Sequence, residues 1–166
     1  TTILLVNPAA GHGRALRLAA QTERAMERAW GAVRRLDSAE PGAAVGLVRQ
    51  AVEQGAERVL VLGGDGTVHE AANGLLQARV SERPPISVIP AGTGNDFAKL
   101  CGTVGHRPEA AIERLARGRV ARLDVGEGWG EFFLNSIGIG FDAEVAERLT
   151  RIKHGRGLPV YLLAVF

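Results

Sequence analysis

The chain has 166 residues, of which 46% are hydrophobic and 23% are charged, and its formal net charge is +2. These values indicate a soluble globular protein that buries a proper core, with room for one domain and part of another. No nucleic-acid partner is expected, because aromatic residues make up only 5% of the chain and no cluster of Lys and Arg interleaves with them. The lone Cys101 excludes an intramolecular disulfide and favours the cytoplasm. No apolar run approaches the ~20 residues of a membrane span, so any membrane contact is expected to be peripheral.

The hydrophobic pattern predicts alternating strands and helices over the first two thirds of the chain. This order is typical of an α/β fold with a doubly wound, mostly parallel sheet and right-handed crossovers. The expected strands are 3–6, 33–36, 58–62 and 86–89, and the expected helices are 15–30, 44–55, 68–79, 97–100 and 108–117.

The pattern changes after Val120. Residues 122–127 and 131–137 read as two strands joined by the turn 128–130, which predicts a hairpin in place of a crossover. We therefore expect a nucleotide-binding α/β domain over 1–121 and the beginning of a β-rich second domain over 122–166. Two strands do not make an independent domain, so the second domain is expected to be truncated. Within it we expect a helix from Asp142 to about Arg151, a basic loop over 153–157 and a further helix from Pro159.

Three of the predicted strands end in a loop that contains glycine: 7–13, 63–67 and 90–96. The carboxyl ends of parallel strands share one edge of a sheet, where ligands collect. Glycine lets the backbone approach a ligand closely, and the first N–H groups of the following helix attract an anion, so phosphate is the expected ligand. None of the loops fits the P-loop pattern or the complete dinucleotide fingerprint.

Asp65 and Asp96 lie in two of these loops, and Asp124 lies beside the predicted hairpin. Carboxylates at a shared edge can hold Mg²⁺ and its waters beside phosphates. The alternative is that aspartate only caps a helix or a turn, which suffices for Asp37 and stays open for Asp124. The scattered histidines do not have the spacing of a zinc site, and Ser136 lacks the elbow of a serine hydrolase.

Four blocks of the sequence together resemble one family. They run in order over essentially the whole chain and are similar to the catalytic domain of diacylglycerol, sphingosine and related bacterial lipid kinases. The G-G-D-G-T turn alone is shared with NAD kinases and, loosely, with phosphofructokinases, whereas P-x-G-T-x-N-D and G-x-G-F-D favour the lipid kinases. The blocks are Asn7 to Gly11, Gly63 to Thr67 with Glu70 and Asn73-Gly74-Leu75, Pro90 to Asp96, and Asn135 with Gly138 to Asp142.

The resemblance implies that ATP lies across the loops of the first domain. It also implies that Asp65, Asp96 and Asp124 are the catalytic aspartates of an aspartate-water-magnesium network. Ala10 replaces the serine that is usual in the first loop, and Ser38 stands where threonine is usual. The implied nucleotide contacts are Asn7, Pro8, Ala9, Ala10, Gly11, Ser38, Gly63, Gly64, Asp65, Gly66, Thr67, Val68, His69, Gly92, Thr93 and Asn95.

The function implied by the resemblance is transfer of the ATP γ-phosphoryl group to a lipid hydroxyl such as that of diacylglycerol, with Mg²⁺. In this family the general base and the ligands of a second magnesium ion lie further along an antiparallel β-sandwich, beyond Phe166, so we expect the 166 residues alone to be inactive. An NAD kinase-like enzyme and a non-catalytic nucleotide-binding regulatory module are the alternatives. The basic segment 148–156 suits anionic headgroups at the inner face of the membrane. The apolar residues near Phe166 predict self-association into a homo-oligomer.

Overall fold

The computed structural model describes residues 1–141, 143–145 and 147, and its first unit is built on a parallel four-stranded sheet. The strands lie in the order β2-β1-β3-β4. The register pairs Val6 with Asp37 on one side and with Leu62 on the other, and it pairs Gly63 with Pro90. All four carboxyl ends therefore lie along one edge of the sheet. The strands are β1 (Thr2–Val6), β2 (Val33–Asp37), β3 (Arg58–Gly63) and β4 (Ile86–Pro90).

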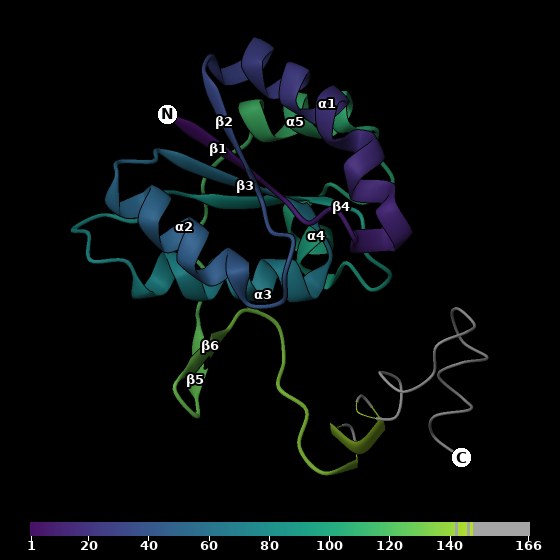
Figure 1. Cartoon of the computed structure of the whole chain (residues 1–166), viewed down its shortest axis with the longest axis vertical. Helices are drawn as coiled ribbons and strands as arrows, with labels where there is room; N and C mark the ends of the chain where they lie inside the picture. The colour runs from purple at the N-terminus through teal and green to yellow at the C-terminus, as the bar shows by residue number, and fades with distance from the viewer. Residues whose placement is uncertain (142, 146, 148–166) are drawn as a thin grey trace. The chain divides into compact units, whose positions relative to one another are not determined.

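Helices cover both faces of this sheet (Figure 1). On one face lie α1 (Ala10–Trp30) and α5 (Pro108–Arg117). On the other face lie α2 (Ala43–Glu53), α3 (Asp65–Gln77) and α4 (Asp96–Cys101). A hydrophobic core lies on each face of the sheet, between the strands and the helices that cover that face. Successive residues of β1 and β3 contribute to one core and then to the other, because side chains along a strand point alternately to opposite faces. The predicted doubly wound α/β fold is confirmed.

A short antiparallel hairpin follows the sheet. It consists of β5 (Gly126–Gly128) and β6 (Glu131–Phe133). The turn between them has positive φ at Trp129 and Gly130, as a tight hairpin turn requires. Both strands are shorter than the sequence predicted: residues 122–125 before β5 and residues 134–137 after β6 do not lie in strands. The hairpin fits the start of a second domain.

Contacts divide the chain into a compact unit of Thr1–Asn135 and a second unit that starts at Ser136. The hairpin belongs to the first unit, where it packs on α3. The domain boundary that the sequence places after residue 121 stays a prediction.

Two helices begin earlier than their periodicity indicated. The helical segment of α1 begins at Ala10 but contains three left-handed residues, Gly11 to Gly13, so its regular part still begins close to the predicted start. Helix α3 begins at Asp65, within the glycine motif itself. Most of the helix predicted from Asp142, the basic segment 148–156 and the helix predicted from Pro159 lie outside the described residues. In the described part of the chain, no helix is long and apolar enough to cross a membrane.

Candidate functional site

The three glycine loops meet at the carboxyl edge of the sheet, as the sequence predicted. The clearest evidence is the closeness of their backbones. A Cβ atom added to Gly11 would lie 2.0 Å from the carbonyl oxygen of Ala91, and one added to Gly92 would lie 2.6 Å from the Cα atom of Gly64. Gly11 also has a φ of 58°, in the left-handed region. Glycine is therefore required at these contacts by the packing of one loop on the next.

Gly66 differs from these glycines. A Cβ atom added to it would meet nothing within 4 Å, and the residue is exposed in the first turn of α3. The packing of the described chain gives no reason for glycine at this position. Room of this kind at the start of a helix is where a phosphate approaches most closely.

Asp65 ties the second loop to the third. Its carboxylate accepts the backbone N–H groups of Asn95 at 2.6 Å and Asp96 at 2.8 Å, and it receives a longer bond of 3.5 Å from Phe97. These are the first N–H groups of α4, whose N-cap residue has no capping side-chain bond of its own. Asp65 therefore caps a helix other than the one that it begins, a role that sequence spacing did not indicate.

Asp96 lies beside Asp65. Both carboxylates lie within 4 Å of the place that a Cβ atom on Gly94 would occupy, at 2.8 Å for Asp65 Oδ2 and 3.8 Å for Asp96 Oδ2. Lys99 donates to Asp96 Oδ1 at 2.5 Å, and this bond raises the pKa of the lysine above its ordinary value. The structure thus brings two of the three predicted aspartates together.

Asp124 is exposed and lies in the irregular segment before β5. Among the residues described, no group of three or more His, Cys, Asp or Glu side chains is placed to hold a metal ion directly. A network in which all three aspartates act through water stays a prediction.

The first loop is fixed by Asn7. Its side-chain oxygen accepts the N–H of Ala9 at 3.0 Å, and its amide donates to Thr67 Oγ1 at 3.0 Å. The start of the third loop is closed by a two-way bond, in which Asn95 both accepts from and donates to the backbone of Gly92. Polar side chains of the motifs therefore hold the loops in place through bonds within the protein itself.

The remaining predicted contacts divide by burial. Thr67 and Ser38 are buried, and the Ser38 N–H donates to the carbonyl of Val6 at 2.8 Å. Val68 is also buried and its side chain packs in the core. Partly or fully accessible at the edge are Pro8, Ala9, Ala10, Gly64, His69, Gly92 and Thr93, while Gly63 is buried.

Two residues of α3 have contacts that sequence reasoning missed. The carboxylate of Glu70 accepts the N–H groups of Gly42 at 3.0 Å and Ala44 at 3.2 Å and so caps α2. Helix α2 has no acidic residue in its first turn and no capping side chain of its own, but nothing in the sequence assigns that cap to Glu70. Asn73 is buried and bonds to the hairpin at Phe132.

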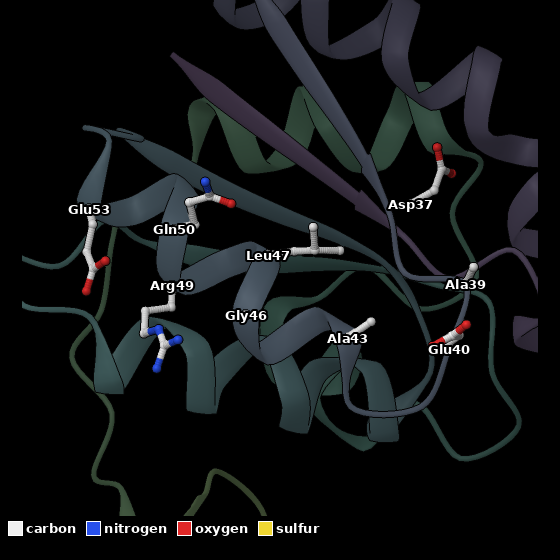
Figure 2. A pocket seen from close by; sticks show the side chains of 9 residues that line it. All are labelled: Asp37, Ala39, Glu40, Ala43, Gly46, Leu47, Arg49, Gln50 and Glu53. Carbon is white, nitrogen blue, oxygen red and sulfur yellow. The ribbon is translucent and has the colours of Figure 1, made fainter.

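A shallow hollow lies beside this edge, over α2 and the end of β2. Figure 2 shows its lining, which runs from Asp37 to Glu53 and includes Leu47. None of the three glycine loops contributes to it. The hollow adjoins Ser38 through that residue's two chain neighbours, so it flanks the candidate site but does not contain it.

Residues 1–128 match the family described as the diacylglycerol kinase catalytic domain. The chain belongs to this family. It is 31% identical to a diacylglycerol kinase of Mycobacterium tuberculosis over 166 residues, which covers 97% of this chain and 52% of the relative. It is 38% identical to a probable YegS-like lipid kinase of Chromohalobacter salexigens over 106 residues, which covers 64% of this chain and 34% of the relative.

Solved structures of the diacylglycerol kinase family share the fold. A putative diacylglycerol kinase from Bacillus anthracis superposes with a TM-score of 0.70 at 32% identity, covering 81% of this chain and 48% of that one. The chain thus spans about half the length of the relative from M. tuberculosis and of this solved structure.

Proposed function

We propose that the chain is the nucleotide-binding part of a lipid kinase that transfers the γ-phosphoryl group of ATP to a lipid hydroxyl. The observation that carries the proposal is the bond between Asp65 and the backbone of Asn95 and Asp96, which fixes two glycine loops side by side at one edge of the sheet. Family membership supports the class of reaction and a lipid alcohol, such as diacylglycerol, as acceptor.

In this proposal the phosphates of ATP bind at the start of α3. The first N–H groups of a helix lack intrahelical partners, and the helix dipole makes this end positive. Gly66 leaves the space through which an anion reaches these groups. The loops after β1 and β4 then lie on either side, with Gly11 and Thr93 at accessible or partly accessible positions.

The two neighbouring carboxylates call for a cation. Lys99 offsets part of the charge of Asp96. Mg²⁺ would offset the remaining repulsion between the two carboxylates and a triphosphate, and also the charge that develops during phosphoryl transfer. Oxygen donors of this kind suit Mg²⁺ with several of its waters. Because Asp65 already accepts two short N–H bonds, few of its lone pairs are left. These residues therefore fit magnesium held through water better than direct coordination.

Transfer to the acceptor is expected to need the rest of the protein. Positioning of donor and acceptor supplies most of the catalysis in phosphoryl transfer, together with a group that takes the proton of the acceptor hydroxyl. We assign that group to the part of the relatives' length that this chain does not cover. The 166 residues alone should therefore bind nucleotide but transfer little phosphate to a lipid. The protein would work in the cytoplasm, in peripheral contact with the membrane that holds its substrate.

The proposal is tested on the whole protein with γ-labelled ATP, Mg²⁺ and a panel of lipid alcohols: diacylglycerol, monoacylglycerol, sphingosine and phosphatidylglycerol. We expect label in the lipid extract, lost when magnesium is chelated. Label transferred to NAD and to none of the lipids would replace the proposal by the NAD kinase alternative. Nucleotide binding without transfer to any acceptor would favour the regulatory module.

A further inference from the structure

The side chain of Asn73 pairs with the hairpin as a neighbouring strand would. Its amide donates to the carbonyl of Phe132 at 2.9 Å, and its oxygen accepts the N–H of Phe132 at 2.9 Å. The second amide hydrogen goes to the carbonyl of His69 at 2.9 Å. Asn73 is only 3% exposed, and asparagine is a poor residue for a helix interior. Both amide hydrogens and the amide oxygen of the side chain therefore form hydrogen bonds within the protein. Because the side chain is buried, contact with water does not explain why an asparagine lies here.

The hairpin offers Asn73 a free edge. Phe132 stands opposite Glu127 in the register of β5 and β6. In an antiparallel pair the backbone groups of alternate residues point toward the partner strand and away from it. Because both backbone groups of Phe132 bond to Asn73, they point away from β5 and toward α3. A second contact flanks the first, between His69 Nε2 and Glu131 Oε2 at 3.1 Å, but both of these side chains are substantially exposed.

The same helix connects this anchor to the glycine motif. Asp65 begins α3, and Asn73 lies eight residues later, which is about 12 Å along a helix that rises ~1.5 Å per residue. A helix of this length is stiff, so a displacement of the hairpin relative to Asn73 is a displacement relative to the loops that Asp65 and Thr67 hold. The hairpin ends at Phe133, just before the first unit of the chain ends at Asn135.

We propose that Asn73 is a positioning residue that fixes the hairpin, and with it the end of the first unit, relative to the phosphate loop at the start of α3. The inference rests on the proposed function for its kinetic consequence but not for its structural one. Loss of the anchor should leave nucleotide binding intact and impair the step that needs both parts of the protein.

The first test is Asn73→Asp in the whole protein. Aspartate has nearly the same shape, but it turns an acceptor toward the carbonyls of Phe132 and His69, where the amide donated. The repulsion between these oxygens should push the strand away from α3 and so break the bond from the Phe132 N–H as well. Hydrogen exchange of the Phe132 amide should become at least tenfold faster, while the amides of β1 and β3 keep their protection. With labelled ATP, kcat should fall at least tenfold and the KM for ATP should stay within about twofold.

A second variant reaches the same bond from the hairpin. Phe132→Pro removes the N–H that Asn73 accepts and, on an outward edge of a strand, takes no bond from the ladder between β5 and β6. It should reproduce the fall in kcat at constant KM for ATP without altering α3. Glu131→Gln is the matched control in the same strand, since it removes only the carboxylate charge from the exposed contact with His69 and should leave both exchange and kinetics nearly unchanged.

Unchanged exchange at Phe132 in Asn73→Asp would overturn the proposal, and so would a KM for ATP that rises in step with falling kcat in Phe132→Pro. If Asn73→Asp loses protection throughout the sheet, Phe132→Pro decides the question by its kinetics. If the wild-type protein phosphorylates no lipid alcohol, the proposed function fails, and exchange at Phe132 in Asn73→Asp alone supports or refutes the anchor.

Discussion

The carboxylate of Asp65 accepts the N–H of Asn95 across the junction of two loops, at 2.6 Å. Asn95 has a left-handed φ of 56°. A residue other than glycine keeps this strained backbone conformation only where its surroundings hold it, and the bond to Asp65 is one such restraint. The bond gives one side chain of the G-G-D-G-T motif a structural task in the P-x-G-T-x-N-D motif. Both motifs are thereby parts of a single site, in which Asp65 has a structural role in addition to the chemical role that we propose.

Asp65→Asn separates the two tasks. Asparagine keeps one acceptor oxygen but presents an amide to one of the N–H groups that the carboxylate bonds, so we expect a loss of roughly 1–3 kcal/mol in the free energy of unfolding, as for a charge-assisted hydrogen bond. Phosphoryl transfer by the whole protein should fall far more than the unfolded fraction explains. Denaturant unfolding and label transfer on the same preparation measure the two effects. Full activity in the folded variant would reduce Asp65 to a helix cap.

Glu70 should matter for stability through α2. Glu70→Ala leaves the N–H groups of Gly42 and Ala44 without their acceptor, and loss of a helix cap costs about 1 kcal/mol, within a range of 0.5–2. Denaturant unfolding measures the change. Glu113→Gln, on the exposed face of α5, serves as the control and should change stability by less than about 0.5 kcal/mol. Equal effects from both variants would argue against the cap.

Gly92→Ala should destabilise the loops. The added Cβ atom would stand 2.6 Å from the Cα atom of Gly64, and the clash is with backbone, which has little freedom to move aside. Overpacking of this kind typically lowers the free energy of unfolding by about 1–3 kcal/mol. Gly46→Ala is a suitable control, because a Cβ atom there meets nothing within 4 Å and the residue lies inside α2. Gly92→Ala with wild-type stability would mean that the loops do not pack as described.

Cys101 should react slowly with thiol reagents. Its partial burial raises the pKa of the thiol above the ordinary value, so the thiolate fraction near neutral pH is smaller than that of a free cysteine, and the fraction grows only as pH rises through the raised pKa. The rate of modification by a disulfide reagent, measured between pH 7 and 9 against glutathione, tests this. A faster rate than glutathione at pH 7 would contradict a raised pKa for this thiol.

Much of the fold could be predicted because its signals are local. Runs such as Val59 to Leu62 alternate with amphipathic helices, and the order of these elements specifies a parallel sheet whose loops share an edge. What could not be predicted are the bonds between distant segments. The spacing of Asp65, Glu70 and Asn73 shows only that they lie on α3, whereas their partners at Asn95, Gly42 and Phe132 depend on how the segments pack.

The lengths of the hairpin strands were overestimated for a related reason. Residues 122–125 have the alternation of a strand, but a strand needs a partner, and within the described chain they have none in the sheet. β-propensity depends on such pairing more than helix propensity depends on packing. Apolar side chains in and around this segment accordingly remain exposed at Val120, Leu123 and Val125.

Gly66→Ala in the whole protein tests the central claim most directly, because packing gives no reason for glycine there. Alanine is the better helix former by up to about 1 kcal/mol, so the unfolding temperature should stay the same or rise. If the start of α3 holds the phosphates of ATP during transfer to a lipid alcohol, kcat/KM for ATP in the labelling of diacylglycerol should nevertheless fall at least tenfold. Undiminished labelling by the Gly66→Ala protein would contradict the account.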